Sequence, residues 1–455
     1  MQREKYMKKD NNNKETELFL HLYLYVNNEI SFLRGYYVNT SSKVIKQRLE
    51  TERLYQSGKS VDDLIESVII RQKDFLSIDT DKLSEVNNMQ VAANVKFCDV
   101  VESLYVSEDK RRVRFKFKDK YKNNNFFNPN IARTKYKEAQ RMESIFFRSV
   151  ITDLIVTYES LLSKLLNVII LKNPFPYLDG ETVPLANYFL DDTFKSIREK
   201  IENVVDKKMY DSLKTMNDII TAEKIDIDKD VLMFFKEIYF RRNAIIHNDC
   251  KVNKQYLNSV STEFRKNIKI GDILPCDQIY LDKAFNTVYG IYFFLFYGLL
   301  KNYYNGNEYV SVISNVAFSH LKEKDYAIAK MIYKKLSTNN FIDFADKMLY
   351  RINYLNAVKQ LKENDILENE IKTLDVSIAT DNYKIAKLCL LDDNEGILSM
   401  LRKTYPQSFT ASEIKEWPIF INFRDSNEYA VFCSEHAEDF SSEEISSDDN
   451  IETEN

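Results

Sequence analysis

Long apolar stretches are the feature that most constrains how this chain can fold. Residues 149–170 read SVITDLIVTYESLLSKLLNVII, and residues 284–300 are more apolar still. The chain has only 8 glycines and 7 prolines, and this scarcity favours helices over turn-rich β architectures. At 455 residues it also exceeds what one hydrophobic core usually holds. We therefore predict a mostly α-helical protein of two or three domains.

The chain divides by composition into four regions. They are a mixed α/β N-terminal region (1–140), a compact helical unit (141–303), a helical region with tetratricopeptide-like cadence (304–430) and an acidic tail (431–455). The tail carries nine acidic residues from position 435 onward and no Lys or Arg, so we interpret it as solvated and disordered. Without it the rest of the chain is slightly basic and tolerates a polyanionic partner.

The N-terminal and C-terminal regions carry weaker patterns. Helices are predicted at 17–37 and 61–75, and strand-like alternation at 91–122, followed by a linker at 123–130. In the C-terminal region LKEKDYAIA at 321–329 is echoed forty residues later by LKENDILEN. This echo predicts stacked helical pairs that form an interaction surface for a regulatory protein partner. An irregular helical domain remains the alternative.

Cysteine usage and the absence of targeting signals indicate the compartment. The five cysteines are scattered and show no CxxC spacing, which favours a reducing environment over disulfides or a zinc site. The polar N-terminus lacks the apolar stretch of a signal peptide. The run at 284–300 contains Asn286 and is short for a membrane span, so we interpret it as a buried helix. We expect a soluble cytoplasmic protein with no membrane contact.

Residues 110–122, KRRVRFKFKDKYK, alternate basic and apolar side chains. A period of two places the bases on one face of a strand. These candidate RNA-binding residues are Arg112, Arg114, Lys116 and Lys118. A solvated amphipathic strand would give the same pattern.

The most unusual segment is FRRNAIIHN at 240–248, in which charges interrupt a predicted helix at 231–247 that Asp230 would cap. Arg241 has a partner in Glu237, four residues earlier. Arg242 projects near the middle of the apolar stripe, where it needs a carboxylate, a subunit interface or an anionic ligand. Glu159 is within a helix that could approach the arginines, although we expect it in a solvated position.

Asn243 and His247 are also four residues apart, so the amide can orient the imidazole. Arg242 and His247 project about 140° apart on an ideal helix. A kink or a second copy of the chain is therefore needed to aim both at one phosphate. Chemically the set suits metal-free RNA cleavage, because histidine exchanges protons near neutral pH and arginine stabilises phosphate charge. Asn248 is predicted to stabilise the helix end.

The segment FFKEIYFRRNAIIHNDCKVNKQYL resembles the signature of HEPN domains, in which an arginine is followed, after four to six residues, by a histidine. Arg242, Asn243 and His247 match this motif, and Glu237 and Arg241 fit its extended form. The resemblance implies a four- or five-helix bundle that forms a homodimer with both motifs facing a shared cleft. Many members are metal-independent endoribonucleases that leave 2′,3′-cyclic phosphate ends, and they often act as toxins or in abortive-infection defence against phage.

The resemblance predicts an endoribonuclease of tRNA or mRNA, with His247 as general acid and base, Arg242 as phosphate contact and Asn243 as orienting group. No metal or other cofactor is expected, since His21, His320 and His436 have no partners at ligand spacing. Two alternatives remain open. One is a non-catalytic helical adaptor in which the charged residues fix helix packing, and the other is a HEPN partner of a nucleotidyltransferase.

Overall fold

The computed structural model describes residues 2–73, 75–92, 95–121, 129–178, 193–303, 308–339 and 342–440. It is mostly helical, as predicted, and it places short strands in the N-terminal region.

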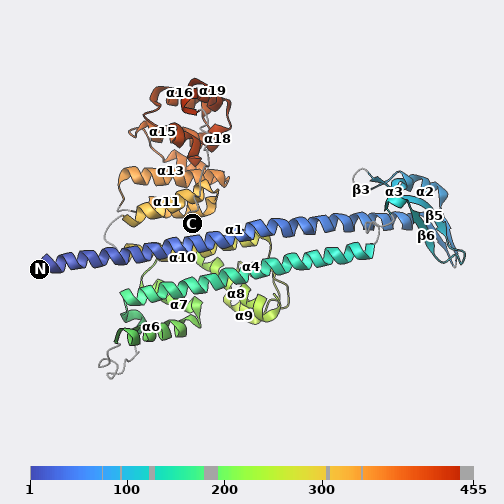
Figure 1. Cartoon of the computed structure of the whole chain (residues 1–455), viewed down its shortest axis with the longest axis horizontal. Coiled ribbons are helices and arrows are strands. Elements are labelled where there is room, and N and C mark those ends of the chain that lie inside the picture. Colours follow the sequence, from blue (N-terminus) through green and yellow to red (C-terminus); the bar gives the residue numbers. More distant parts are fainter. Residues whose placement is uncertain are drawn as a thin grey trace, which may run out of the picture.

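Two long helices lie side by side and run in opposite directions along the molecule (Figure 1). They are α1 (Gln2–Val68) and α4 (Pro129–Lys172). Tyr37 stacks on Phe146 at 6.3 Å, and Tyr55 stacks on Tyr136 at 5.4 Å. Because α4 supports α1 along its polar middle, the helix predicted at 17–37 and residues 61–68 of the helix predicted at 61–75 belong to one continuous helix. Residues 69–72 and Phe75 belong to strands instead.

The predicted domain boundary at residue 140 falls inside α4. The buried apolar residues of α1 between Phe19 and Tyr37 share one core with α4, so this part of α1 packs into the helical bundle. Residues 129–130, expected in a linker, belong to the first turn of α4, while 122–128 lie outside the described residues.

Three two-stranded antiparallel sheets lie at the end of the α1–α4 pair where the chain leaves α1 (Figure 1). The strands are β1 (Ile69–Gln72), β2 (Phe75–Ile78), β3 (Gln90–Ala92), β4 (Val95–Lys96), β5 (Val101–Val106) and β6 (Val113–Phe117), interspersed with α2 (Thr80–Asn87), α3 (Phe97–Val100) and η1 (Asp119–Tyr121). Five buried residues form their own small core: Val68, Val86, Phe97, Val100 and Val101. The strand-like pattern at 91–122 is thus partly correct, because α3 interrupts it.

The most apolar helix, α10 (Gln278–Tyr303), lies at the centre of the main core. Residues 287–297 are buried on every side of this helix, which confirms the prediction of a buried helix at 284–300. Four helices pack around it: α1, α4, α8 (Lys229–Asn248) and α12 (Tyr326–Ser337). Three shorter helices lie against α4, namely α5 (Phe175–Leu178), α6 (Thr193–Met209) and α7 (Ser212–Ala222). Helix α9 (Lys254–Ser259) lies against α8.

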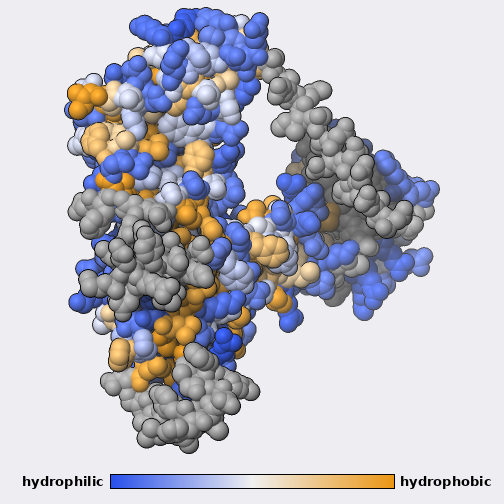
Figure 2. Space-filling view, turned by 60° about the vertical axis from the view of Figure 1, so that its left-hand side comes forward, coloured by the Kyte–Doolittle hydropathy of each residue, from blue (hydrophilic) through white to orange (hydrophobic). Residues whose placement is uncertain are grey.

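Among the described residues, one helix, Ala132–Lys172 within α4, is long and apolar enough to cross a membrane by length and composition alone. Half of the most apolar window of this helix is buried inside the protein. Figure 2 shows that hydrophobic residues on the visible face gather along the bundle, whereas the C-terminal helices and the strand-bearing end are mostly hydrophilic.

The C-terminal region consists of short helices packed in successive pairs (Figure 1). They are α11 (Glu308–Lys322), α12 (Tyr326–Ser337), α13 (Phe344–Gln360), α14 (Asn364–Lys372), α15 (Asp381–Leu391), α16 (Asn394–Thr404), α17 (Ala411–Glu416), η4 (Pro418–Phe420), α18 (Ile421–Arg424), α19 (Asn427–Glu435) and α20 (Ala437–Phe440).

The first three pairs are joined by the same turn. A residue with positive φ closes the first helix, namely Lys324 (67°), Lys362 (59°) or Asp392 (57°), and the acidic residue after it begins the second helix. These turns lie 38 and 30 residues apart. The forty-residue sequence echo is therefore two residues out of structural register, since the turn geometry, and not the repeated letters, marks equivalent positions.

The acidic tail begins later than predicted. Helices α19 and α20 continue to Phe440, and Arg402 binds Glu435 through two guanidinium nitrogens. Tyr405 packs against Phe432 at 5.3 Å and against His436 at 4.6 Å. These apolar and ionic contacts order residues 431–440, and 441–455 lie outside the described part of the chain.

Candidate active site

The motif residues lie on α8, which is unbroken from Lys229 to Asn248. The helix begins at Asp228, whose Oδ1 accepts hydrogen bonds from the backbone N–H of Asp230 (2.9 Å) and Val231 (3.4 Å). Asp228, and not the predicted Asp230, is therefore the N-cap. The helix ends at Asp249 in the left-handed region, with φ 49°. Because no kink precedes this end, a kink does not bring Arg242 and His247 together within one chain.

Glu237 and Arg241 form a buried ion pair, as the spacing predicted. Arg241 Nε donates to Glu237 Oε1 at 2.8 Å, and the two residues are 7% and 0% exposed. The Arg241 guanidinium also lies over the Tyr280 ring at 4.1 Å and donates to the Pro275 carbonyl. The centre of the buried face of α8 is thus occupied by Arg241, where the helical projection predicted Arg242.

Two tyrosines complete the hydrogen bonding of Glu237. Tyr256 donates to Oε1 and Tyr280 donates to Oε2, each at 2.6 Å. Burial, together with the Glu237 charge, raises the pKa of both hydroxyls above its usual range, so they remain donors at neutral pH. A carboxylate with three donors can stay buried. Each tyrosine is followed by a leucine, at 256–257 and at 280–281, but this repeated pair does not by itself predict that both tyrosines bind Glu237.

Arg242 contacts a carboxylate of another helix. A carboxylate is one of the three kinds of partner that we expected for this arginine. Its Nη2 lies 3.1 Å from Glu159 Oε2 on α4, and Nη1 donates to Asn243 Oδ1 at 3.1 Å. Glu159 also accepts a hydrogen bond from Ser212 Oγ at 3.0 Å. The side chains of Arg242 and Glu159 are 16% and 27% exposed, so the expectation of a solvated Glu159 was wrong. Arg242 Nε is buried and has no hydrogen-bond partner among the described residues.

A second ion pair holds the end of α8 against α4. Arg148 Nη1 lies 3.5 Å from Asp249 Oδ1. This pair and Arg242–Glu159 bracket residues 242–249, and their order shows that α4 and α8 are antiparallel here. Arg148 was not recognised from the sequence because it lies 101 residues from its partner. It adds a cation close to the motif in space.

His247 is exposed between these two ion pairs. Among the described residues its ring makes no hydrogen bond, and the predicted contact with Asn243 is replaced by the bond from Arg242 to Asn243. Asn248 Nδ2 donates to the Lys251 carbonyl at 2.7 Å, so Asn248 stabilises the helix end as predicted. The arrangement offers a solvent-accessible imidazole near the end of the helix that also carries one anchored guanidinium.

The basic strand residues lie far from this site. Arg112, Arg114, Lys116 and Lys118 are all exposed, and Lys116 Nζ binds Glu102 Oε1 at 2.8 Å. They belong to the strand-bearing end, from which α4 rises about 45 Å before it reaches Glu159. Within one chain the structure therefore does not bring the two candidate RNA-binding features together.

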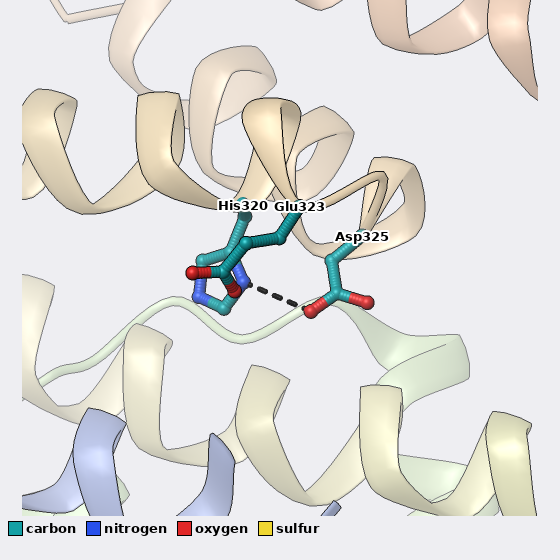
Figure 3. A group of neighbouring side chains, drawn as sticks. All are labelled: His320, Glu323 and Asp325. Atoms are coloured by element: carbon teal, nitrogen blue, oxygen red, sulfur yellow. Dashed lines mark hydrogen bonds and ion pairs between the residues drawn. The ribbon is translucent and has the colours of Figure 1, made fainter. Parts of the chain in front are cut away.

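One group of side chains could hold a metal ion, formed by His320, Glu323 and Asp325 (Figure 3). Their ligand atoms lie within 4.8 Å of one another, so the statement that His320 has no partners at ligand spacing was wrong. His320 Nδ1 lies 3.3 Å from Asp325 Oδ2, and Arg34 Nη1 of α1 lies 3.0 Å from Asp325 Oδ1.

His320 is 3% exposed, and its Nε2 lies 3.1 Å from Asn27 Oδ1 of α1. Both ring nitrogens thus have protein partners, and Arg34 already places a positive charge at Asp325. These contacts make buried His320 and partly buried Asp325 a polar link between α1 and the start of the C-terminal helical pairs, while Glu323 is exposed.

Comparison of the chain with protein-family models, with curated proteins and with solved structures finds no match. The residues and the geometry of the site are therefore the basis for a proposed function.

Proposed function

We propose that this chain is a metal-independent endoribonuclease of the HEPN type. The observation that carries the proposal is the location of the motif at the end of α8, where His247 is exposed and Arg242, about one and a half turns earlier on the same helix, is partly exposed. Glu237 and Arg241 are engaged in the buried network and serve to position the helix. The motif residues thus separate into a buried supporting pair and a surface pair.

In the proposed reaction, His247 removes the proton from a ribose 2′-OH, and the 2′-oxygen attacks the adjacent phosphorus. The protonated His247 then returns a proton to the leaving 5′-oxygen as general acid, which gives a 2′,3′-cyclic phosphate and a 5′-hydroxyl end. Arg242 stabilises the charge of the phosphate. Two of its five N–H groups are used by Asn243 and Glu159, which leaves three for an anion if the side chain turns outward.

The unbroken helix supports a homodimer as the active form. Arg242 and His247 project about 140° apart, so one copy of α8 does not aim both at a single phosphate. Two exposed apolar residues flank the motif, Val156 on α4 (50%) and Ile246 on α8 (47%), and a second copy would cover them. His247 of one copy would then act with Arg242 of the other.

We propose that the enzyme acts in the cytoplasm on tRNA or mRNA as a toxin or an anti-phage effector. The paired C-terminal helices would hold a regulatory protein, and the basic strand end would contact RNA outside the cleavage site. Expression of active protein is then toxic to cells.

A helical adaptor is the second candidate. The ion pairs Arg242–Glu159 and Arg148–Asp249 hold α8 on α4 without any RNA, as a purely structural contact would. In an adaptor, His247→Ala would preserve function and expression would not be toxic.

The decisive experiment maps RNA ends in cells that express the wild type, His247→Ala or His21→Ala. His21 is an exposed histidine on α1, away from the motif, and is a matched control. We expect new 5′-hydroxyl ends with the wild type and His21→Ala, and none with His247→Ala. Identical RNA ends in all three strains would contradict the nuclease and favour the adaptor.

A further inference from the structure

The C-terminal helices form a cavity of about 560 Å³ that is open to solvent. It is lined by side chains of α11, α12, α13, α15 and the segment 409–417, including Phe318, Asn353, Tyr383 and Trp417. Its size is within the range of sites that bind small molecules or peptide side chains. No residue of the proposed nuclease site lines it.

Aromatic rings form much of the wall. Five of the lining residues are aromatic: Phe318, Tyr333, Tyr383, Phe409 and Trp417. Trp417 Nε1 donates to Asn353 Oδ1 at 3.1 Å, and the Trp417 ring packs against Phe409 at 5.5 Å. Asn353 is only 3% exposed, so these contacts hold the indole in place. The indole is therefore positioned before any ligand binds.

The charged residues that line the cavity are both acidic. Glu413 and Glu416 line it, and none of its lining residues in the described part of the chain is Lys or Arg. Both glutamates are exposed at its edge. A hydrogen bond from Lys322 lowers the pKa of Glu416, so this carboxylate is charged at neutral pH. Fixed aromatic faces beside carboxylates attract organic cations and repel anions.

We propose that this cavity binds a lysine or arginine side chain carried by a peptide segment of a partner protein. The cation would lie against the aromatic wall near Glu413 and Glu416. Asn315, Asn382 and Ser412, which also line the cavity, supply neutral amide and hydroxyl groups for the peptide backbone. This assignment does not depend on ribonuclease activity.

Lys322 acts as an internal competitor in this arrangement. Its Nζ lies 2.9 Å from Glu416 Oε2, where the cation of the partner would bind. Removal of the Lys322 charge therefore frees Glu416 for the peptide. The variant Lys322→Met is expected to bind several-fold more tightly, a direction that general damage to the fold would not produce.

The experiment uses the full chain and its own fluorescence, because Trp417 is the single tryptophan. The probe is acetyl-Gly-Gly-Lys-Gly-Gly-amide, and the control peptide has norleucine in place of lysine. We expect a saturable change in Trp417 emission with the lysine peptide and about tenfold weaker binding of the norleucine peptide. Glu416→Gln is expected to weaken binding of the lysine peptide by a similar factor.

Glu368→Gln removes an exposed carboxylate of α14 outside the cavity and is the matched control, expected to bind like the wild type. Circular dichroism establishes that each variant is folded. Equal affinity for the two peptides, no emission change with the lysine peptide, or tight binding retained by Glu416→Gln would overturn the proposal.

Discussion

Arg242 Nη2 on α8 lies 3.1 Å from Glu159 Oε2 on α4, and this ion pair joins residues that are 83 positions apart in the sequence. The neighbouring Arg241 pairs instead with Glu237 of its own helix, in a fully buried setting. Two consecutive arginines therefore differ in role, since one completes the core and the other meets solvent at the helix surface.

The two glutamates are expected to differ in their effect on stability. Glu237→Gln removes the charge that balances buried Arg241, and we expect it to lower the free energy of unfolding by about 3 kcal/mol. Glu159→Gln affects a partly exposed pair and is expected to cost less than about 1 kcal/mol. Urea unfolding of the two variants measures both values. A larger loss for Glu159→Gln would show that the burial argument is wrong.

Replacement of His247 separates stability from activity. Because its side chain is exposed and makes no hydrogen bond among the described residues, His247→Ala is expected to change the free energy of unfolding by no more than about 0.5 kcal/mol. RNA cleavage is expected to fall by about 10²–10⁴-fold if His247 transfers the proton. Urea unfolding and cleavage of end-labelled RNA measure the two effects, and unchanged cleavage would remove His247 from the mechanism.

The sequence predicted some contacts within one helix correctly, although not the one between Asn243 and His247, and it was insufficient for contacts between helices. The Glu237–Arg241 pair follows from the four-residue spacing, and the Asn248 contact follows from its place at a helix end. The partner of Arg242 does not, because Glu159 meets it only when α4 and α8 are antiparallel. The centre of the buried face was also misplaced, since tyrosines from two later segments, Tyr256 and Tyr280, allow a charged pair to be buried there.

Stability is expected to fall steeply in alkali. In the folded protein the pKa values of Tyr256 and Tyr280 are raised, whereas the tyrosines of an unfolded chain ionise at about pH 10. Their stabilising effect is complete below that pH and is lost as the pH rises above it, because only the unfolded chain then releases their protons. Unfolding midpoints measured from pH 8 to pH 11 check this. Tyr280→Phe removes one such proton and should make the decline shallower.

Two glycines of α10 should respond differently to alanine. A Cβ at Gly290 would approach the flexible end of Met331 at 2.9 Å, whereas at Gly298 it would meet branched Ile225 at 2.8 Å. Gly290→Ala is therefore expected to be neutral or to stabilise by up to about 1 kcal/mol through helix propensity.

Gly298→Ala should destabilise by about 1–3 kcal/mol, because Ile225 cannot move aside without repacking. Thermal unfolding of the two variants gives the comparison. Equal melting temperatures would mean that the segment at Ile225 shifts freely against α10.

The sequence also failed to predict the length of α1, for a physical reason. Between its apolar stretch at 18–38 and Val68 the helix is rich in polar residues, so periodicity alone predicts a break. The partner helix α4 supplies contacts such as Arg48–Glu143, at 3.1 Å, that keep this stretch helical. The sequence predicted that the C-terminal region contains paired helices, and it does. The positions of the turns between them could be located only from backbone geometry.

The continuous helix α1 fixes the distance between two surfaces of the molecule. Asn27 contacts His320 beside the C-terminal pairs, and Val68 belongs to the small core under the strands. At the rise of an α-helix these two points lie about 60 Å apart, roughly twice the diameter of a small domain. A single compact binding partner is too small to reach both ends at once. Simultaneous occupation therefore requires either two separate partners or one elongated molecule, such as a folded RNA.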